Sequence, residues 1–153
     1  MKTGDIIYHK NLVFTNNMVD TKKNRPCIFL FEEEKEDGNY IYSIPLTTQT
    51  RTFNKHSKEY FFVPQVIYSY KKLNFAYLKG IVCSNAKNVI DTGIKIDEMI
   101  IECILERVAK LDIHGKQKEY YDHIKSMLLY TRLFDEIDER EKTTKRYNKI
   151  ISK

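Results

Sequence analysis

The stretch that decides the fold runs from Arg25 to Thr48 and reads RPCIFLF-EEEKEDGN-YIYSIPLTT. Residues 26–31 are almost continuously apolar and rich in aromatic and branched side chains, which predicts a short strand buried on both faces. Residues 40–46 predict a second strand, and the connection over residues 32–39 carries the turn signal Asp-Gly-Asn. In an antiparallel hairpin the start of the first strand and the end of the second lie side by side. The guanidinium of Arg25 and the hydroxyl of Thr47 are therefore expected at one edge of a small sheet.

Shorter β-prone segments surround this hairpin. Residues 3–8 predict a first strand with Ile6, Ile7 and Tyr8 in the core. Further strands are expected over residues 60–63 and 65–68, on either side of a proline, and within residues 74–83. In the last of these segments Gly80 marks a bulge or a close approach of backbone.

Two helices are expected to follow the strands. Residues 97–111 predict an amphipathic helix capped by Asp97, and a second helix is expected over residues 116–139, after the break at His114-Gly115. The charged tail over residues 139–153 is expected to fray. The predicted apolar stripe of the first helix is Ile100, Cys103, Ile104, Val108 and Leu111, and that of the second is Tyr120, Ile124, Met127, Leu128, Thr131, Phe134 and Ile137.

Length and composition limit the class of protein. A chain of 153 residues suggests one domain with a real core. The N-terminus lacks the apolar core of a signal peptide, and no apolar run approaches the ~20 residues that a membrane span needs. Cys27, Cys83 and Cys103 are odd in number and show no paired metal spacing. We therefore expect reduced thiols in a cytoplasmic protein that does not bind membranes.

The net charge of +5 is unevenly distributed. Residues 1–80 contain twelve Lys and Arg against eight Asp and Glu, and five of those acids lie in the hairpin connection. Residues 81–153 are nearly balanced, with fourteen against thirteen. A basic first half favours a polyanionic partner through phosphate neutralisation. The alternative is a basic composition with no such partner.

Four motifs occur in a fixed order along the chain: Gly4-Asp5-Ile6-Ile7, Arg25-Pro26, Pro45-Leu46-Thr47-Thr48 and the segment over residues 83–90. In order and spacing they resemble the MazF/PemK (Kid) family of toxin endoribonucleases, over roughly residues 3–112. The resemblance implies an α+β fold, mainly β with C-terminal helices. Its core is an SH3-like small β-barrel of the MazF/PemK/CcdB type, with five to seven mainly antiparallel strands over residues 3–96.

The fourth motif departs from the family pattern. Asn85 and Lys87 stand where the family has Gln and Arg, and Ser84 stands where some members use an acid in the chemistry. The family domain would cover residues 1–112. Residues 113–153 would then be a helical extension that packs on the same domain or on a dimer partner. The resemblance also implies a homodimer and a cognate antitoxin protein.

The implied activity is sequence-specific cleavage of single-stranded RNA without a metal or other cofactor, leaving 2′,3′-cyclic phosphate and 5′-hydroxyl ends. RNA supplies its own nucleophile, the 2′-hydroxyl. Arg25 would hold the phosphate whose charge grows in the transition state, and Thr47 would donate a hydrogen bond to it. The structural alternative makes Arg25 an ion-pair partner of Asp5, and Thr47 a turn hydroxyl bonded to backbone.

No residue is singled out as the general base. His9, Asp5 and Asp20 are the candidates, although a solvent-facing position at a strand end is the first expectation for His9. The polar, basic segment over residues 49–60 interleaves cations with aromatic rings, as single-stranded RNA requires for phosphates and bases. The alternative is a solvated hairpin loop whose two aromatic rings pack into the barrel. The expected RNA-binding residues are Lys22, Lys23, Thr48, Arg51, Phe53, Lys55, His56, Lys58, Asn85 and Lys87.

Two other functions share the small barrel. One is a gyrase poison of the CcdB type, which relies on a C-terminal tryptophan-containing motif, whereas this chain has no Trp. The other is a nucleic-acid-binding barrel that has lost cleavage, which the altered segment around Ser84 permits.

Overall fold

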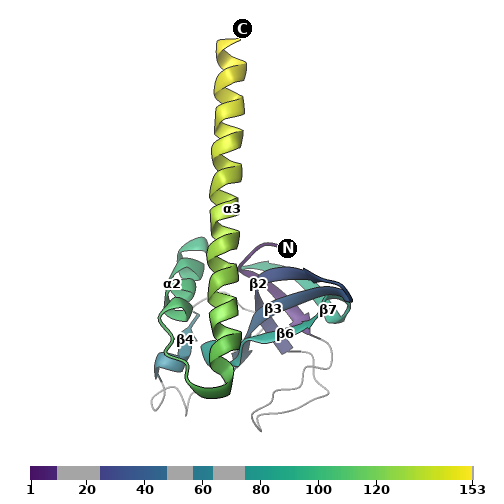
Figure 1. Ribbon diagram of the computed structural model, residues 1–153, viewed down its shortest axis with the longest axis vertical. Coiled ribbons are helices and arrows are strands. Elements are labelled where there is room, and N and C mark those ends of the chain that lie inside the picture. The colour runs from purple at the N-terminus through teal and green to yellow at the C-terminus, as the bar shows by residue number, and fades with distance from the viewer. Residues whose placement is uncertain (10–24, 48–56, 64–74, 153) are drawn as a thin grey trace. The chain divides into compact units, whose positions relative to one another are not determined.

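The computed structural model describes residues 1–9, 25–47, 57–63 and 75–152 (Figure 1). The chain divides into two compact units, Met1–Asp112 and Ile113–Lys153. The first unit contains all the described strands and one helix, and the second contains one long helix. Together they form an α+β fold. None of the helices within these described ranges is long and apolar enough to cross a membrane.

Seven described strands form one sheet, and every pairing described in it is antiparallel. The order is β4-β5-β3-β2-β1-β7, and β6 pairs with β3 next to β5. The strand pairs described do not close the sheet into a ring. The strands are β1 (Asp5–His9), β2 (Arg25–Lys35), β3 (Gly38–Thr47), β4 (Tyr60–Phe62), β5 (Phe75–Tyr77), β6 (Val82–Asn85) and β7 (Val89–Lys95).

The sequence predicted some of these strands better than others. The segment over residues 74–83 forms two strands, β5 and the start of β6, separated by the 3₁₀ turn η3 (Leu78–Gly80). A further turn, η4 (Ala86–Asn88), joins β6 directly to β7, which the sequence did not predict as a strand. The strand expected over residues 65–68 lies outside the described residues.

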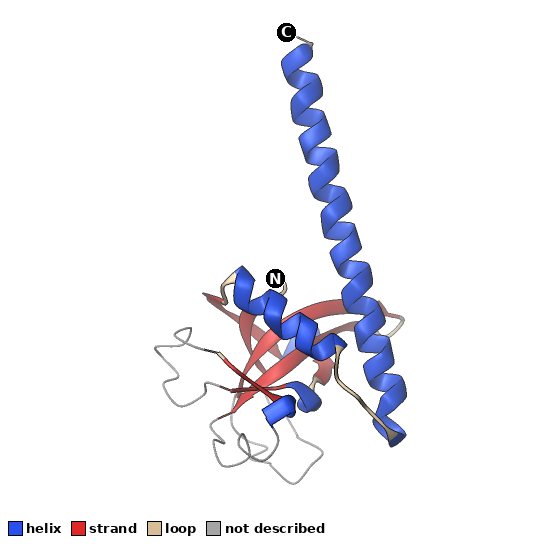
Figure 2. Cartoon of the chain, turned by 90° about the vertical axis from the view of Figure 1, so that its left-hand side faces the viewer, coloured by secondary structure: helices blue, strands red, loops and turns tan. Residues whose placement is uncertain are grey.

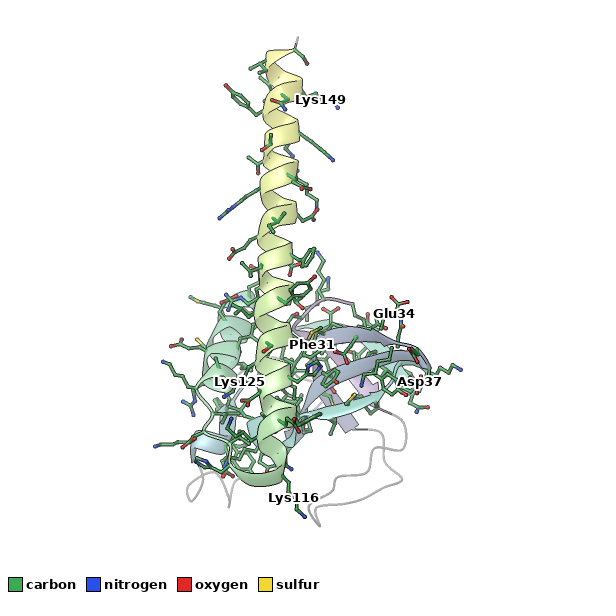
Figure 3. The ribbon with its side chains drawn as sticks, in the orientation of Figure 1. Phe31, Glu34, Asp37, Lys116, Lys125 and Lys149 are labelled. Atoms are coloured by element: carbon green, nitrogen blue, oxygen red, sulfur yellow. The ribbon has the colours of Figure 1, made fainter. Side chains whose placement is uncertain are left out.

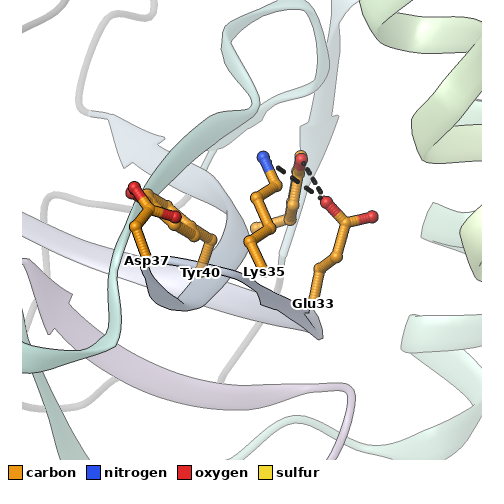
Figure 4. A network of polar contacts seen from close by, with 5 residues as sticks. Glu33, Lys35, Asp37 and Tyr40 are labelled. Atoms are coloured by element: carbon orange, nitrogen blue, oxygen red, sulfur yellow. Dashed lines mark hydrogen bonds and ion pairs between the residues drawn. The ribbon is translucent and has the colours of Figure 1, made fainter.

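The predicted central hairpin is confirmed, but its connection is much shorter than expected. Strand pairing continues as far as Lys35 opposite Gly38, so only Glu36 and Asp37 remain in the turn. The reason is visible in the paired side chains near the tip (Figure 4). Lys35 Nζ lies 3.5 Å from Glu33 and over the ring of Tyr40, and the Tyr40 hydroxyl donates to Asp37 over 2.6 Å.

The acidic tip therefore extends the hairpin because Glu33, Lys35 and Asp37 have local partners. Tyr42 adds a hydrogen bond from its hydroxyl to Glu33, and its ring stacks on Phe31 with centroids 4.5 Å apart. Figure 3 shows Phe31 on the sheet, with Glu34 and Asp37 towards the hairpin tip. The hydrogen bond from Tyr40 holds the pKa of Asp37 below its usual value.

The sheet curls around an apolar cluster. Strand β3 pairs with β2 along one edge and with β6 and β5 along the other, so side chains from several strands face a common interior. Because η4 joins the edge strand β7 to β6, strands at opposite ends of the path β7-β1-β2-β3-β6 are also neighbours in the chain. The cluster consists of Ile7, Cys27, Phe29 and Ile41, with Val82, Ala86 and Val89 packed against it.

Helix α2 (Glu98–Ala109) lies across the sheet (Figure 2). Asp97 caps it as predicted, because its carboxylate accepts from the backbone N–H of Met99 over 2.8 Å. The predicted stripe was partly wrong, since Cys103 is exposed and the helix buries Ile101, Ile104, Leu105 and Val108. The position of Ile101 against Gly4 turns the buried face away from Cys103.

The second unit is dominated by one uninterrupted helix, α3 (Lys118–Ile151), preceded by the turn η5 (Gly115–Gln117). At 1.5 Å per residue its 34 residues extend for about 51 Å. The expectation that the chain frays after Glu139 is wrong. Residues 116–153 contain no Gly or Pro, and an ion pair of 3.1 Å between Lys142 and Asp138 joins successive turns across the predicted end at Glu139.

Gly4 tests the packing of α2 on the sheet. Its φ is +101°, and a Cβ there would lie 2.8 Å from Cγ1 of Ile101. We expect Gly4→Ala to lower the free energy of unfolding by about 2 to 4 kcal/mol, because left-handed strain and overpacking add. Gly93 has a φ of +78° but nothing within 4 Å of the added Cβ, so Gly93→Ala should cost about 1 to 2 kcal/mol. Equal losses in urea denaturation would contradict this packing.

Candidate functional site

The strand register brings the ends of β1, β2 and β3 to one edge of the sheet. His9, the last residue of β1, pairs with Arg25, the first residue of β2. On the other side of β2, Cys27 pairs with Pro45. Arg25 lies two residues before Cys27 and Thr47 lies two residues after Pro45, so both lie towards the same edge. Three segments far apart in the sequence thus end together. The hydroxyl-bearing Thr47 is buried, with 5% of its surface exposed.

His9 was expected to face solvent, and this expectation is wrong. The residue is fully buried, and both ring nitrogens have partners. Nε2 lies 2.6 Å from the hydroxyl oxygen of Ser43 on β3, and Nδ1 lies 2.6 Å from that of Ser84 on β6. Ser43 is fully buried and Ser84 is half-buried. The imidazole therefore connects β1, β3 and β6, and the chain of hydrogen bonds ends at the half-buried hydroxyl of Ser84.

These contacts require a strongly curled sheet. His9 pairs with Arg25, whereas Ser43 pairs with Phe29, four residues further along β2. In a flat sheet that offset, combined with a separation of two strands, would place the backbones of His9 and Ser43 about 16 Å apart. The hydrogen bond of 2.6 Å shows instead that the side chains meet inside the curl. Burial lowers the pKa of His9 from 6.5 to about 4, so the ring is neutral at neutral pH.

Asp5 is not brought to the same edge. It lies at the opposite end of β1, four residues from His9, which corresponds to about 13 Å of strand. Its carboxylate accepts a hydrogen bond of 2.9 Å from the backbone N–H of Lys2. This geometry gives Asp5 a local role in the turn that begins β1.

An aromatic row continues outward from Thr47. Thr47 pairs with Phe75 on β5, and Phe75 pairs with Phe62 on β4. Residues directly opposite each other share a face of the sheet. The rings of Phe62 and Phe75 have centroids 5.5 Å apart and are tilted by 57°. Phe75 is 9% exposed and Phe62 is 49% exposed, so the row ends in an accessible ring.

Helix α2 contacts strand β4 on the face opposite to the aromatic row. The guanidinium of Arg107 lies 6.0 Å from the ring centroid of Phe61 and donates to the backbone carbonyl of Tyr60 over 3.5 Å. Tyr60 also stacks on Tyr77 of β5, with centroids 4.8 Å apart. Because neighbouring residues of a strand point to opposite faces, covering Phe61 leaves Phe62 on the other face.

The other predicted site residues are only partly described. Lys58 is exposed in the turn η1 (Ser57–Glu59), and Lys87 is exposed in η4. Asn85 caps that turn by accepting the backbone N–H of Lys87 over 3.0 Å. The backbone of Arg25 belongs to β2, and its side chain is outside the described part. The predicted residues outside the described ranges are Asp20, Lys22, Lys23, Thr48, Arg51, Phe53, Lys55 and His56.

Sequence reasoning missed Ser43 and Phe62. Ser43 stands in an otherwise apolar strand, and a polar residue at a buried position is the signal that it needs a partner. Phe62 follows Phe61, and a pair of aromatics in one strand must place one ring on each face. Across the described ranges, no three His, Cys, Asp or Glu residues are placed to hold a metal ion together.

Comparison with protein-family models and with curated proteins finds no match to this chain.

The titration of His9 gives a measurable consequence. The pKa of about 4 in the folded protein lies below 6.5, so the unfolded chain binds a proton first as the pH falls. The titration of His9 therefore leaves the free energy of unfolding unchanged above pH 6.5. Between pH 6.5 and 4 it lowers this free energy by at most about 3 kcal/mol. Urea denaturation across this range should show the loss in wild type and in His114→Gln, whose imidazole is exposed. The same loss in a folded His9→Gln variant would contradict the assignment to His9.

Proposed function

We propose that this protein is a metal-independent endoribonuclease that cleaves single-stranded RNA, of the kind found as the toxin in toxin–antitoxin systems. One observation carries the proposal. The first three motifs that resemble the MazF/PemK family lie at β1, at β2 and at the end of β3, and the pairing of His9 with Arg25 brings the ends of these strands together with Thr47. Backbone positions this close support a site in which a guanidinium and a hydroxyl bind the same phosphate.

The roles follow from the chemistry of RNA. The 2′-hydroxyl attacks the adjacent phosphorus, the bond to the 5′-oxygen breaks, and the products carry a 2′,3′-cyclic phosphate and a 5′-hydroxyl. Arg25 stabilises the negative charge that develops on the phosphate, because its guanidinium remains protonated at every relevant pH. Thr47 donates a hydrogen bond to the same group. Water takes up the proton of the 2′-hydroxyl and supplies the proton of the 5′-oxygen.

The aromatic row supplies a binding surface beside this edge. An exposed ring stacks on a nucleobase of any sequence, since every base has a π face. Phe62 lies two strands from Thr47, which corresponds to about 10 Å. A base next to the cleaved linkage can therefore lie on Phe62 while the phosphate lies at the edge.

The proposal includes the finer features implied by the resemblance. The curled sheet is a small SH3-like barrel of the MazF/PemK/CcdB type, and the protein acts as a homodimer that a cognate antitoxin inhibits. The exposed apolar side chains of α3 support self-association, because such a stripe gains free energy when covered. They are Leu129, Tyr130, Leu133, Phe134, Ile137, Tyr147, Ile150 and Ile151.

Single-turnover cleavage of a long single-stranded RNA in EDTA tests the reaction and its two principal residues. Arg25→Ala removes a charged donor to the transition state and should slow cleavage by about 10² to 10³-fold, or about 3 to 4 kcal/mol. Arg25→Lys should recover only part of the rate, because a point charge lacks the bidentate fork. Thr47→Val, nearly isosteric, should slow cleavage with little change in RNA affinity.

Thermal melts of each variant serve as folding controls. Cleavage at the wild-type rate by folded Arg25→Ala would show that the site lies elsewhere. A wild-type protein that binds RNA and yields no cyclic phosphate would instead favour a nucleic-acid-binding protein without cleavage.

A second prediction concerns Phe62. Phe62→Ala should weaken the binding of single-stranded RNA by about 1 to 3 kcal/mol, because a base loses its stacking partner. Fluorescence anisotropy with a labelled oligonucleotide measures this affinity. Met99 on α2 is 73% exposed and provides a matched control, since Met99→Ala also removes an exposed apolar side chain. Equal affinities of Phe62→Ala and wild type would remove Phe62 from the interface.

A further inference from the structure

The hydrogen bonds of His9 have a direction that burial determines. In the neutral ring one nitrogen donates and the other accepts. The Ser43 hydroxyl is fully buried, and within the described residues its partner is Nε2 of His9. A buried hydroxyl that does not donate costs free energy, so the Ser43 hydroxyl donates to Nε2. The ring proton is therefore on Nδ1, and it is donated to the Ser84 oxygen over 2.6 Å.

This direction leaves the Ser84 proton free to point away from His9. Ser84 is half-buried, in contrast to the two residues behind it, and its oxygen accepts from the imidazole. Hydrogen bonds in a chain polarise one another, which makes the last hydroxyl a stronger donor than an isolated serine. The low dielectric around fully buried His9 strengthens each link.

The donor lies within reach of the Arg25 edge. The Cα atoms of antiparallel partners lie about 4.5 to 5.5 Å apart, and His9 and Arg25 are such partners. From the Cα of His9, three covalent bonds of about 1.5 Å lead to Nδ1, and Ser84 Oγ is 2.6 Å beyond. The Ser84 hydroxyl is therefore within about 13 Å of the Arg25 Cα. A six-bond arginine side chain and a phosphate group can span that separation.

We infer that Ser84 is a catalytic residue that donates a hydrogen bond to a non-bridging oxygen of the phosphate being cleaved, and that His9 and Ser43 are positioning residues that fix this donor. The inference rests on the proposed function and identifies a further group in its site. No proton is transferred through the chain, so His9 stays neutral and the three groups keep their protons throughout. The imidazole is unsuited to act as the base, because its acceptor nitrogen faces Ser43 in the interior.

The decisive experiment combines Ser84 variants with substrates modified at one oxygen. RNA is prepared with a single Rp or Sp phosphorothioate at the linkage that wild type cleaves, and single-turnover rates are measured. Sulfur accepts hydrogen bonds weakly, so one diastereomer should react slowly with wild type. Ser84→Ala should cleave ordinary RNA about 10²-fold more slowly, as for the loss of one preorganised donor. The penalty for that one diastereomer should then fall at least several-fold.

Two further variants separate a donor from a merely structural residue. Ser84→Thr keeps a hydroxyl and should retain most of the rate and the same diastereomer preference. Ser43→Ala should lower the rate without touching RNA, and its effect should not add to that of Ser84→Ala, because both remove one donor chain.

The possible outcomes are distinct. A folded Ser84→Ala variant with the wild-type rate, or one that is slower with unchanged preference between Rp and Sp, overturns the inference while cleavage by wild type upholds the proposed function. If wild type yields no cyclic phosphate from any RNA, the proposed function fails, and the inference fails with it.

Discussion

The burial of one imidazole is the constraint on which the shape of the described sheet depends. His9 ends β1, yet its ring reaches Ser43 on β3 and Ser84 on β6 through two hydrogen bonds of 2.6 Å. A charged ring could not remain there without a large desolvation cost, so the sheet must hold it neutral. The ring thereby joins β1 to β3 and to β6, which are not its neighbours in the sheet, while strand register brings β1, β2 and β3 to one edge.

The hydrogen-bonded polar residues lie next to an apolar cluster inside the sheet. Ile7, Cys27, Phe29 and Ile41 form the cluster inside the curl. His9 and the two serines that it connects extend from this cluster to half-buried Ser84. RNA cleavage through the 2′-hydroxyl makes few chemical demands on a protein. It needs fixed donors around a phosphate and a surface for bases, and electrostatic preorganisation supplies most of the acceleration in such sites. In the proposed function, the edge where β1, β2 and β3 end meets these demands.

Local sequence patterns predicted the elements whose signals are local. The hairpin over residues 25–48 was predicted because aromatic and branched residues surround a turn signal. Helix α2 was predicted because its apolar residues recur at helical spacing and Asp97 caps its first turn. Strand β7 was missed because its residues alternate only weakly. The buried face of α2 was predicted at the wrong angle around the helix, because it depends on the packing of Ile101 against Gly4, almost a hundred positions away in the sequence.

The candidate site likewise combines features set by local sequence with features set by long-range packing. The approach of the strand ends that carry Arg25 and Thr47 was predicted from hairpin register, because a hairpin fixes which ends are neighbours. The burial of His9 could not be predicted, because it depends on how far the sheet curls and on serines 34 and 75 residues away. Phe62 was overlooked because its exposure depends on Arg107 of α2 covering its neighbour Phe61. Residues whose role depends on long-range packing are the ones that sequence pattern does not reveal.

The state of the His9 ring is the most direct test of this account. Nitrogen-15 NMR of the imidazole, recorded from pH 5 to 8, distinguishes the two neutral tautomers and the protonated form. We predict a neutral ring with its proton on Nδ1 throughout this range, because the ring is buried and the Ser43 hydroxyl donates to Nε2. A proton on Nε2, or a ring that titrates near pH 6.5, would contradict it.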